Sequence, residues 1–297
     1  MISIIITSFK EPGTIGRAIE SFQNQKEIGD KVEIIVVAPD EETLEVVRKY
    51  AKKDKQIKIF KDPGKGKSYA LNLLLPKLKG EIIILSDGDV YVSENSVQEI
   101  LKKFEDEKVG CVSGRPVPQN SRNNLFGYWS HLLCDAGAHE ARLKRDKKEK
   151  YFECSGYLWA FRNKIIRKFL TDVPEDSVVP LLFYKRGYKI AYASDAKVYV
   201  SYPKNLRDFI DQKKRTTKAH IQMSNYYNFN KLPKTKSFKN ELFESYRAFL
   251  YPGNFKEFFW TVILFPLKLY IWALSYYHVK IIKKYHKDGW TAIKSTK

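Results

Sequence analysis

Two aspartates separated by one glycine carry the strongest chemical signal in the sequence. Asp87, Gly88 and Asp89 follow the apolar run EIIIL (81–85), which has the composition of a buried strand. Two adjacent carboxylates repel each other unless a cation lies between them, and hard divalent ions such as Mg²⁺ or Mn²⁺ prefer oxygen ligands. The pair therefore indicates a divalent metal shared with a diphosphate. A turn in which aspartate is merely favoured is the alternative.

Charged side chains also follow each of the three apolar runs upstream. Glu11 and Asp40 come shortly after the first and second apolar runs, and the loop DPGKGKS (62–68) follows the third. This loop is not a P-loop, because Lys61 stands where the first glycine of that motif is required. Its backbone N–H groups and Lys67 can still bind phosphate at a helix N-terminus. Asp40 also suits the N-cap of a following helix.

These residues lie between short β-branched runs and stretches with helical spacing. The apolar runs are residues 2–7, 32–37, 56–60, 81–85 and 109–114. Unbroken apolar strands separated by amphipathic helices predict a mostly parallel sheet with helices on both faces, which is a doubly wound, Rossmann-like α/β fold. In such sheets ligands bind at the carboxyl ends of the strands. We therefore expect the acidic residues to meet at that edge.

Net charge is distributed unevenly along the chain. The 297 residues include 53 Lys or Arg and 34 Asp or Glu, so the formal charge is +19. Residues 203–297 contain 19 basic and 6 acidic side chains, a surplus of +13, which leaves +6 for residues 1–202. The C-terminal third should therefore favour an anionic partner. Nucleic acid is disfavoured, because the aromatic residues there are gathered in one apolar segment and are not interleaved with basic ones.

That apolar segment is FFWTVILFPLKLYIWALSYY (258–277), which is near the length needed to span a bilayer. Lys268 at its centre disfavours insertion by about 3 kcal/mol, and Thr261, Lys268 and Ser275 fall near one helical face. Four lysines follow it: Lys280, Lys283, Lys284 and Lys287. We expect an amphipathic helix in the membrane interface, with its basic residues on anionic head groups. A spanning helix, or one packed on the catalytic domain or on a dimer partner, is the alternative.

The three cysteines, Cys111, Cys134 and Cys154, are odd in number, widely spaced and without a CxxC pair, so we expect reduced thiols in the cytosol. The apolar start of the chain is interrupted by Lys10 and Glu11, so it is predicted to be a buried strand and not a secretory signal.

Several motifs in chain order resemble the nucleotide-sugar-dependent glycosyltransferases of family 2. They are SIIITSFKE (3–11), VVAPD (36–40), GKGKSYALN (64–72), LSDGD (85–89), CSGYLWAFR (154–162), PED (174–176) and QKKR (212–215). The last two are similar to the Glu-Asp and Q-x-x-R motifs of cellulose- and hyaluronan-synthase-like members. The resemblance covers roughly residues 1–220. It implies the GT-A fold and metal-dependent, inverting transfer from a UDP-sugar, with GDP as the second choice of nucleotide.

The resemblance also implies roles for individual residues. Donor-binding residues would be Thr7, Phe9, Glu11, Asp40, Asp62, Lys67, Asp87, Gln212 and Arg215. Asp89, with Asp87, would hold Mg²⁺ or Mn²⁺, and Asp176 would be the general base. On the acceptor side would lie Gly156, Tyr157, Trp159 and Glu175. The residues alone leave two alternatives open. Glu175 and Asp176 could cap the N-terminus of a helix, and Gln212 and Arg215 could lie on a solvated helical face.

The sequence departs from the family pattern in three places. Asp40 stands alone where paired aspartates are usual, Thr216 replaces the tryptophan after Q-x-x-R, and only one apolar segment follows the catalytic region. We therefore expect a monotopic enzyme on the cytoplasmic face of the membrane that adds one or a few sugars to a glycan or lipid-linked acceptor. The alternative is a polyprenyl-phosphate glycosyltransferase, whose acceptor is the polyprenyl phosphate. A second copy of the chain, in a homodimer, is a further candidate partner.

Two other functional classes compete with this interpretation. A nucleotidyltransferase would carry a glycine-rich basic loop after the first strand, which FKEP (9–12) does not match. A basic membrane- or nucleic-acid-binding protein with a degenerate site conflicts with the intact Asp87, Asp89 and Asp176. We expect a nucleotide-sugar-binding half at residues 1–115, an acceptor-binding and catalytic half at 116–240, and a membrane-associating helical region at 241–297.

Overall fold

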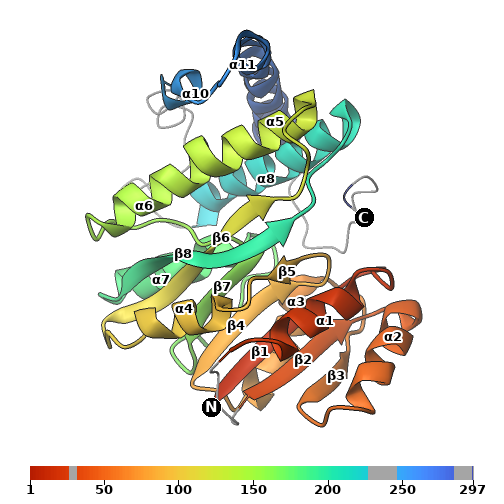
Figure 1. Ribbon diagram of the computed structural model, residues 1–297. Helices are drawn as coiled ribbons and strands as arrows, with labels where there is room; N and C mark the ends of the chain where they lie inside the picture. The colour runs from red at the N-terminus through yellow and green to blue at the C-terminus, as the bar shows by residue number, and fades with distance from the viewer. Residues whose placement is uncertain (27–31, 227–245, 284–295, 297) are drawn as a thin grey trace.

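A computed structural model of the chain describes residues 1–26, 32–226, 246–283 and 296. Within these residues the strands form one eight-stranded sheet in the order β3-β2-β1-β4-β7-β6-β8-β5 (Figure 1). The strands are β1 (Ile2–Thr7), β2 (Val32–Ala38), β3 (Ile57–Lys61), β4 (Ile82–Asp87), β5 (Tyr91–Val92), β6 (Val109–Pro118), β7 (Leu158–Arg162) and β8 (Lys189–Val200). The sheet thus contains all five predicted runs.

The two halves of the sheet differ in strand direction. The strands β3, β2, β1 and β4 are parallel. The next strand, β7, is antiparallel to both β4 and β6, while β8 is parallel to β6. The run at 109–114 therefore does not lie beside β4, because β7 from later in the chain separates them. The sheet is mixed, and its parallel half is the one that carries the upstream motifs.

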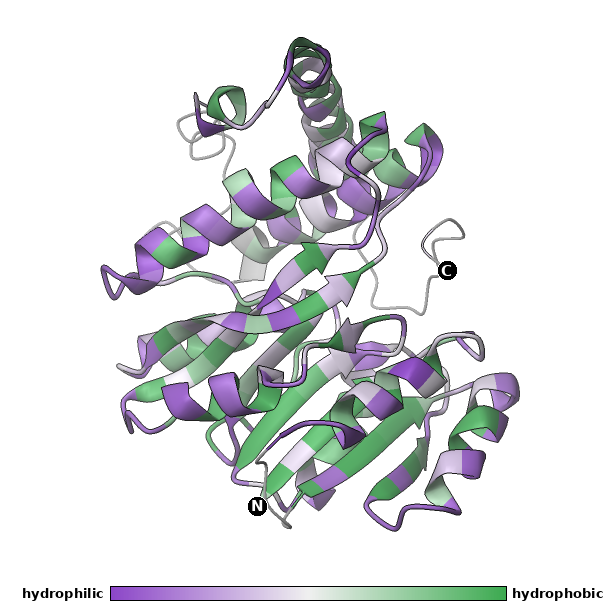
Figure 2. Cartoon of the chain, viewed as in Figure 1, coloured by the Kyte–Doolittle hydropathy of each residue, from purple (hydrophilic) through white to green (hydrophobic). Residues whose placement is uncertain are grey.

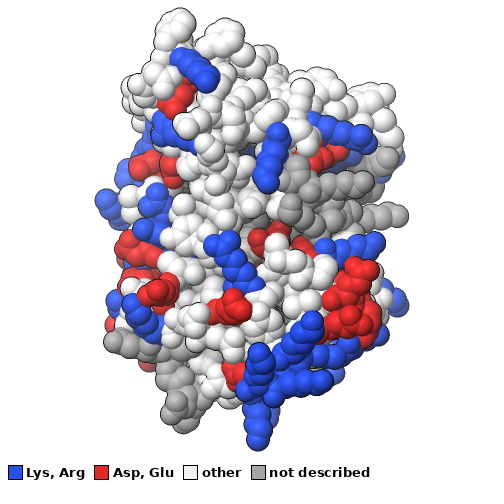
Figure 3. All heavy atoms as spheres, turned by 45° about the vertical axis from the view of Figure 1, so that its right-hand side comes forward, with Lys and Arg blue, Asp and Glu red and all other residues white. Residues whose placement is uncertain are grey.

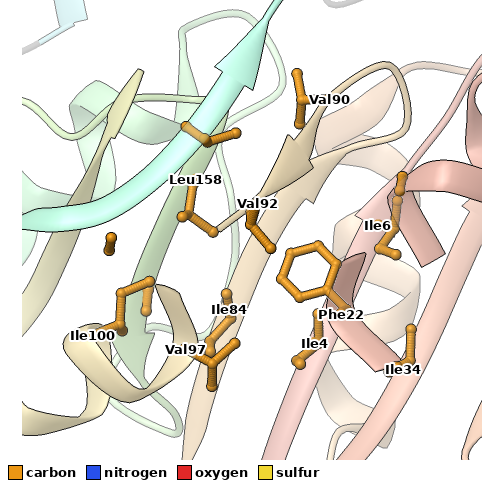
Figure 4. Packing of buried hydrophobic residues seen from close by; sticks show 14 of the residues in the cluster. Ile4, Ile6, Phe22, Ile34, Ile84, Val90, Val92, Val97, Ile100 and Leu158 are labelled. Atoms are coloured by element: carbon orange, nitrogen blue, oxygen red, sulfur yellow. The ribbon is translucent and has the colours of Figure 1, made fainter. Parts of the chain in front are cut away.

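Helices cover both faces of the sheet, as predicted. On one face lie α1 (Ile15–Gln23), α2 (Glu41–Ala51) and α4 (Ser96–Lys103); on the other lie α3 (Lys67–Leu74), its 3₁₀ extension η1 (Leu75–Lys77) and α7 (Glu175–Lys185). Successive strand side chains point to opposite faces, so Ile4 and Ile6 pack with Phe22 of α1 while Ile5 packs on the α3 side (Figure 4). The alternation explains why these strands are apolar throughout.

A third group of helices lies beyond the sheet (Figure 1). It comprises α5 (Leu125–Leu132), the π-helical turn η2 (Leu133–His139), α6 (Glu140–Asp146), α8 (Leu206–Tyr226), α10 (Tyr246–Leu250), α11 (Phe255–Tyr276) and the π-helical turn η4 (Tyr277–Ile281). A separate apolar cluster joins α5, α8 and α11 through Trp129, Phe209, Leu264 and Ile271. The predicted C-terminal helix is therefore present and packs on the catalytic domain.

Helix α11 buries polar side chains together with Leu264 and Ile271, and it exposes most of its other apolar side chains. Glu257, Thr261 and Ser275 are buried, and Arg122 donates to both Glu257 oxygens at 2.7 Å. The outer face of α11 consists of exposed apolar residues: Phe255, Phe258, Phe259, Val262, Ile263, Leu269, Tyr270 and Tyr276. The helix is mostly green, with some purple bands, in Figure 2, and the same end of the molecule is largely uncharged in Figure 3.

The structure does not fully test the predicted domain boundaries or the predicted group of lysines after the apolar helix. The boundary at residue 115 falls inside β6, and the boundary at 240 lies outside the described residues, so the three-part division stays a prediction. Lys284 and Lys287 also lie outside the described residues, whereas Lys280 and Lys283 are exposed beyond α11.

Candidate active site

The parallel strands bring the upstream motifs to one edge. In the sheet register Thr7 stands opposite both Val37 and Asp87. The Thr7 hydroxyl donates to Asp87 Oδ1 at 3.2 Å, and the Gly88 N–H donates to the Thr7 carbonyl at 2.8 Å. At the neighbouring strand end the Asp62 N–H donates to the Ala38 carbonyl. The ends of four parallel strands thus form a continuous polar edge, as the sequence predicts.

Asp40 organises the loop after β1 and also caps a helix. Its Oδ1 accepts from the Thr43 N–H at 3.0 Å at the start of α2, and its Oδ2 accepts from the Lys10 N–H at 2.8 Å. Lys10 has φ of +53°, a backbone conformation that costs a residue with a side chain about 1 kcal/mol. Partial burial raises the pKa of Asp40, but these hydrogen bonds outweigh it and hold the pKa below its usual value. The capping alternative is confirmed, and nucleoside binding by Asp40 stays a prediction.

Glu11 turns back onto the same loop and explains the glycine between the two aspartates. Its Oε2 accepts from the Ser8 hydroxyl at 2.8 Å and lies 3.4 Å from the Phe9 nitrogen. A Cβ on Gly88 would lie 2.9 Å from Glu11 Oε2 and closer still to Ser8. The DGD turn can therefore pack against the first loop only because its central residue has no side chain.

Lys67 lies between two carboxylates from distant parts of the chain. Its Nζ is 2.8 Å from Asp87 Oδ1 and 2.9 Å from Glu175 Oε1, and all three side chains are largely buried. Burial alone would lower the pKa of Lys67, but Asp87 and Glu175 together raise it well above its usual value. Gly66, with φ of +118°, provides the backbone turn that starts α3 at Lys67. This lysine links the DGD turn to the first turn of α7.

Asp176 stands beside that link in the first turn of α7. A Cβ on Gly156 would lie 3.1 Å from Asp176 Oδ2, and the Cys154 N–H donates to the Asp176 carbonyl. The N-cap of α7 is Pro174, so Glu175 and Asp176 are first-turn acids that suit the helix dipole, and neither is the N-cap itself. The absence of a side chain at Gly156 allows the Asp176 carboxylate to approach this part of the backbone closely.

Tyr157 and α8 close the other side of the site. Burial raises the pKa of the Tyr157 hydroxyl, as do the nearby charges of Asp89 and Asp87, while Arg215 opposes them. Arg215 is exposed on α8, and Gln212 one turn earlier has a buried Oε1 without a hydrogen-bond partner among the described residues. Arg215 thus lies within electrostatic range of Tyr157, as do Asp87 and Asp89, and donor binding by the Q-x-x-R residues stays a prediction.

Trp159 was predicted to lie on the acceptor side, and this prediction is wrong. Its side chain is fully buried in β7, and its ring stacks on that of Phe161 with the centroids 5.3 Å apart. The strand is paired on both sides, by β4 and by β6, so the indole belongs to the core. Three further residues were not predicted from the sequence. Ser177 lies next to Asp176, Glu153 lies next to Ser177, and His220 lies next to Glu153.

The acidic residues suit one divalent cation. No group of three or more His, Cys, Asp or Glu able to hold a metal occurs in the described part of the chain. Mg²⁺ commonly takes only one or two carboxylates and completes its shell with water and substrate phosphates. Asp87 and Asp89 at the end of β4 match that requirement, with Asp87 shared with Lys67. The residues present therefore fit a metal that binds together with a diphosphate.

Comparisons with known proteins agree with this architecture. A family model, Glycosyl transferase family 2, matches residues 3–170. An N-acetylglucosaminyltransferase of Rhizobium meliloti is 23% identical over 241 residues, which cover 73% of this chain and 55% of the relative. A hyaluronan synthase of Streptococcus pyogenes is 23% identical over 172 residues, covering 54% and 41%. This chain spans about half the length of these relatives.

Solved structures show the same fold at low identity. The mannosyltransferase PcManGT from Pyrobaculum calidifontis, in complex with GDP-Man and Mn²⁺, has a TM-score of 0.60 at 18% identity and covers 91% of this chain and 75% of that one. S. aureus TarS 1-349 in complex with UDP-GlcNAc has a TM-score of 0.52 at 14% identity, covering 92% and 79%. Because the family model covers more than half of the chain, the protein belongs to glycosyl transferase family 2 and has the GT-A fold.

Proposed function

We propose that the protein transfers a sugar, with inversion, from a nucleotide diphosphate sugar to a hydroxyl of a glycan or lipid-linked acceptor. The observation that carries this proposal is the Lys67 link. It joins Asp87, on the donor side, to Glu175, the neighbour of Asp176. A metal-binding pair and a candidate base are thereby held in one contiguous site. A UDP-sugar is the first donor to test and a GDP-sugar the second, since similar folds have been solved with each.

The chain's own residues divide the work of the proposed reaction. Asp87 and Asp89 would hold Mg²⁺ or Mn²⁺, which supplies positive charge for the departing nucleoside diphosphate. Asp176 Oδ2, on the side of Gly156, would accept the proton of the acceptor hydroxyl as that oxygen attacks the anomeric carbon. Attack opposite the leaving group in one displacement inverts the anomeric configuration. Arg215 on α8 would stabilise the diphosphate charge.

The remaining predicted residues would bind the nucleoside and the acceptor. The donor set Thr7, Phe9, Glu11, Asp40 and Asp62 lies along the strand ends and the first loop. Tyr157 is supported as an acceptor-side residue by its position between the DGD turn and α8. Trp159 is not part of this proposal.

A thermal-shift screen tests the donor proposal, because a ligand that binds only the folded state raises the unfolding temperature. UDP- and GDP-sugars are added with and without Mn²⁺. We expect one of them to stabilise the protein only with the metal, and Asp89→Ala to remove that shift. Asp54→Ala, which changes a half-buried aspartate after α2, is the matched control and should keep it. Equal shifts with and without Mn²⁺ would remove the metal assignment.

We also propose that the outer face of α11 lies in the plane of the cytoplasmic membrane interface. The helix is long and apolar enough to cross a membrane by length and composition, with 22% of its most apolar window buried. A spanning position is disfavoured because its polar side chains are bound to α5 and the preceding loop. An in-plane position leaves those contacts intact and places the exposed aromatics in the interface, where aromatic side chains are favoured.

A further inference from the structure

Behind the proposed base lies a chain of three buried polar residues from three parts of the sequence. Ser177 follows Asp176 in α7 and is 1% exposed; its Oγ is 3.1 Å from Glu153 Oε2 and 3.5 Å from Asp176 Oδ1. Glu153 is 7% exposed, and its Oε2 is 3.6 Å from His220 Nε2 of α8. The order in space is therefore Asp176, Ser177, Glu153 and His220.

The two oxygens of Asp176 face different surroundings. Oδ2 lies on the side of Gly156, where the acceptor hydroxyl is proposed to bind, whereas Oδ1 lies on the side of Ser177. The carboxylate thus stands between the proposed acceptor position and the buried chain. This is the geometry that a group needs if it receives a proton on one side and releases it on the other.

Glu153 is held firmly in this position. Arg142 Nε donates to its backbone carbonyl at 3.1 Å, and the next residue, Cys154, donates to the Asp176 carbonyl. Tyr151 donates to the Ser177 carbonyl at 3.1 Å, so segment 151–154 is bound along the first turn of α7. A buried carboxyl group is costly to the fold unless it is paired or hydrogen-bonded. The Ser177 hydroxyl and the His220 imidazole are two of the polar groups that lie against the Glu153 carboxylate.

We propose that Ser177, Glu153 and His220 form a relay that removes the acceptor's proton from Asp176 after each transfer. This inference rests on the proposed role of Asp176 as the base. Once Asp176 is protonated, a half-turn about its Cβ–Cγ bond, a soft torsion, brings the acidic O–H to Ser177. The proton then bonds to Ser177 Oγ while the serine's own proton moves to Glu153 Oε2.

The relay ends at His220. Glu153, now a carboxylic acid, gives its proton to His220 Nε2, which requires the tautomer whose proton is on Nδ1. Asp176 and Glu153 are then carboxylates again, Ser177 has regained a hydroxyl proton, and His220 carries the positive charge until it releases the proton to solvent or buffer. His220 keeps 10% side-chain exposure, the largest of the three relay residues. Imidazole is suited to this terminal step because its ordinary pKa is near neutrality.

The test uses the full-length protein and measures nucleoside diphosphate release from UDP-N-acetylglucosamine and from GDP-mannose, with water as the acceptor. Ser177→Ala and Glu153→Gln should each lower kcat about 10-fold or more with unchanged donor KM, because they affect proton removal and not donor binding. Ser177→Thr, which keeps the hydroxyl, should restore turnover. Combining Ser177→Ala with Glu153→Gln should lower kcat no further than either alone, since both break one chain.

Matched controls separate the relay from a structural role. Ser130→Ala removes a buried hydroxyl in α5, and Glu33→Gln changes a buried glutamate of β2 that accepts from Ser3; both should leave kcat unchanged. His220→Ala should lose turnover and regain it when free imidazole is added, as an outside proton acceptor would allow.

The outcomes also separate this inference from the proposed function. If Asp176→Asn removes turnover while Ser177→Ala and Glu153→Gln keep it, the relay is wrong and the base stands. If Ser177→Thr fails to restore turnover, or imidazole does not restore His220→Ala, these residues are structural and the relay is also overturned. Near-normal turnover of Asp176→Asn would overturn the base, and the relay with it.

Discussion

The sheet edge and α11 depart from the usual arrangement of a soluble protein in opposite ways. At the sheet edge, charged side chains such as Lys67 and Glu175 are turned inward and paired with one another. On α11, apolar side chains such as Phe255, which is 84% exposed, are turned outward. Soluble chains ordinarily bury apolar groups and expose charges. The inward charges surround a place for a charged substrate, and the outward apolar face suits an apolar surface.

The largest expected effect separates turnover from membrane binding. Asp176→Asn keeps the size of the base but removes its negative charge. We expect sugar transfer to fall roughly 10²–10⁴-fold, with donor affinity and binding to anionic lipid vesicles unchanged. Initial rates and vesicle co-sedimentation measure the two properties on one sample. Loss of vesicle binding in this variant would mean that the two regions are not independent.

Lys67→Met should damage both turnover and stability. It leaves Asp87 and Glu175 buried without their common cation, and breaking a buried ion pair from one side typically costs about 3 kcal/mol. Urea unfolding measures this loss, and vesicle binding of the folded fraction should persist. Lys102→Met is the control, since its contact with Glu99 is on the surface. An unfolding free energy equal to that of this control would show that the Lys67 link does not stabilise the fold.

Phe259→Glu should weaken vesicle binding about 30-fold, because burying a phenylalanine side chain contributes about 2 kcal/mol. Turnover on a soluble acceptor should not change. Leu73→Glu places the same charge on an exposed apolar position of α3 and should bind vesicles normally. If Phe259→Glu instead converts a dimer to a monomer and leaves vesicle binding intact, the outer face of α11 is covered by a second copy and not by lipid.

The smallest expected effect concerns the ion pair that holds α11 in place. A hydrogen bond from Arg122 holds the pKa of Glu257 below its usual value. Because that pKa is lowered on folding, the pair stabilises the protein above the ordinary glutamate pKa of about 4.3. The contribution is lost as pH falls through the lower folded value. Arg122→Met should therefore reduce stability by about 1 kcal/mol at neutral pH and have little effect in strong acid, as measured by urea unfolding. An equal loss at both pH values would mean that packing, and not charge, is responsible.

Local sequence patterns predict the parallel half of the molecule well and the other half less well. Short apolar runs followed by acidic residues specify strand ends, so Asp40, Asp62 and Asp87 lie on one edge as expected. The run LWAFR (158–162) has the same composition, yet it enters the sheet antiparallel between β4 and β6. Strand direction depends on contacts between distant segments, and apolar composition alone does not specify it.

The contacts of individual residues that sequence patterns do not predict have the same origin. Trp159 is in an acceptor-side motif, but its place in a doubly paired strand makes it a core residue. Lys67 was expected to bind phosphate, and its contact with Glu175 depends on two segments that are far apart in the sequence. No motif marks Glu153 and His220, because two residues that meet only in the folded chain have no fixed spacing in the sequence. The one sequence feature that could have pointed to Glu153 is that it is the only charged residue in the stretch 151–161.

The polar contacts of α11 join it to residues far upstream, so they also determine when the helix can dock during biosynthesis. Arg122 precedes Glu257 by 135 positions, and Tyr128 precedes Thr261, whose hydroxyl lies 2.6 Å from the tyrosine hydroxyl, by 133. Arg122 and Tyr128 are therefore synthesised well before α11, and the helix can dock its polar side only once these partners have left the ribosome. Delivery to the lipid surface would accordingly follow synthesis, as a property of the folded enzyme and not of the nascent chain.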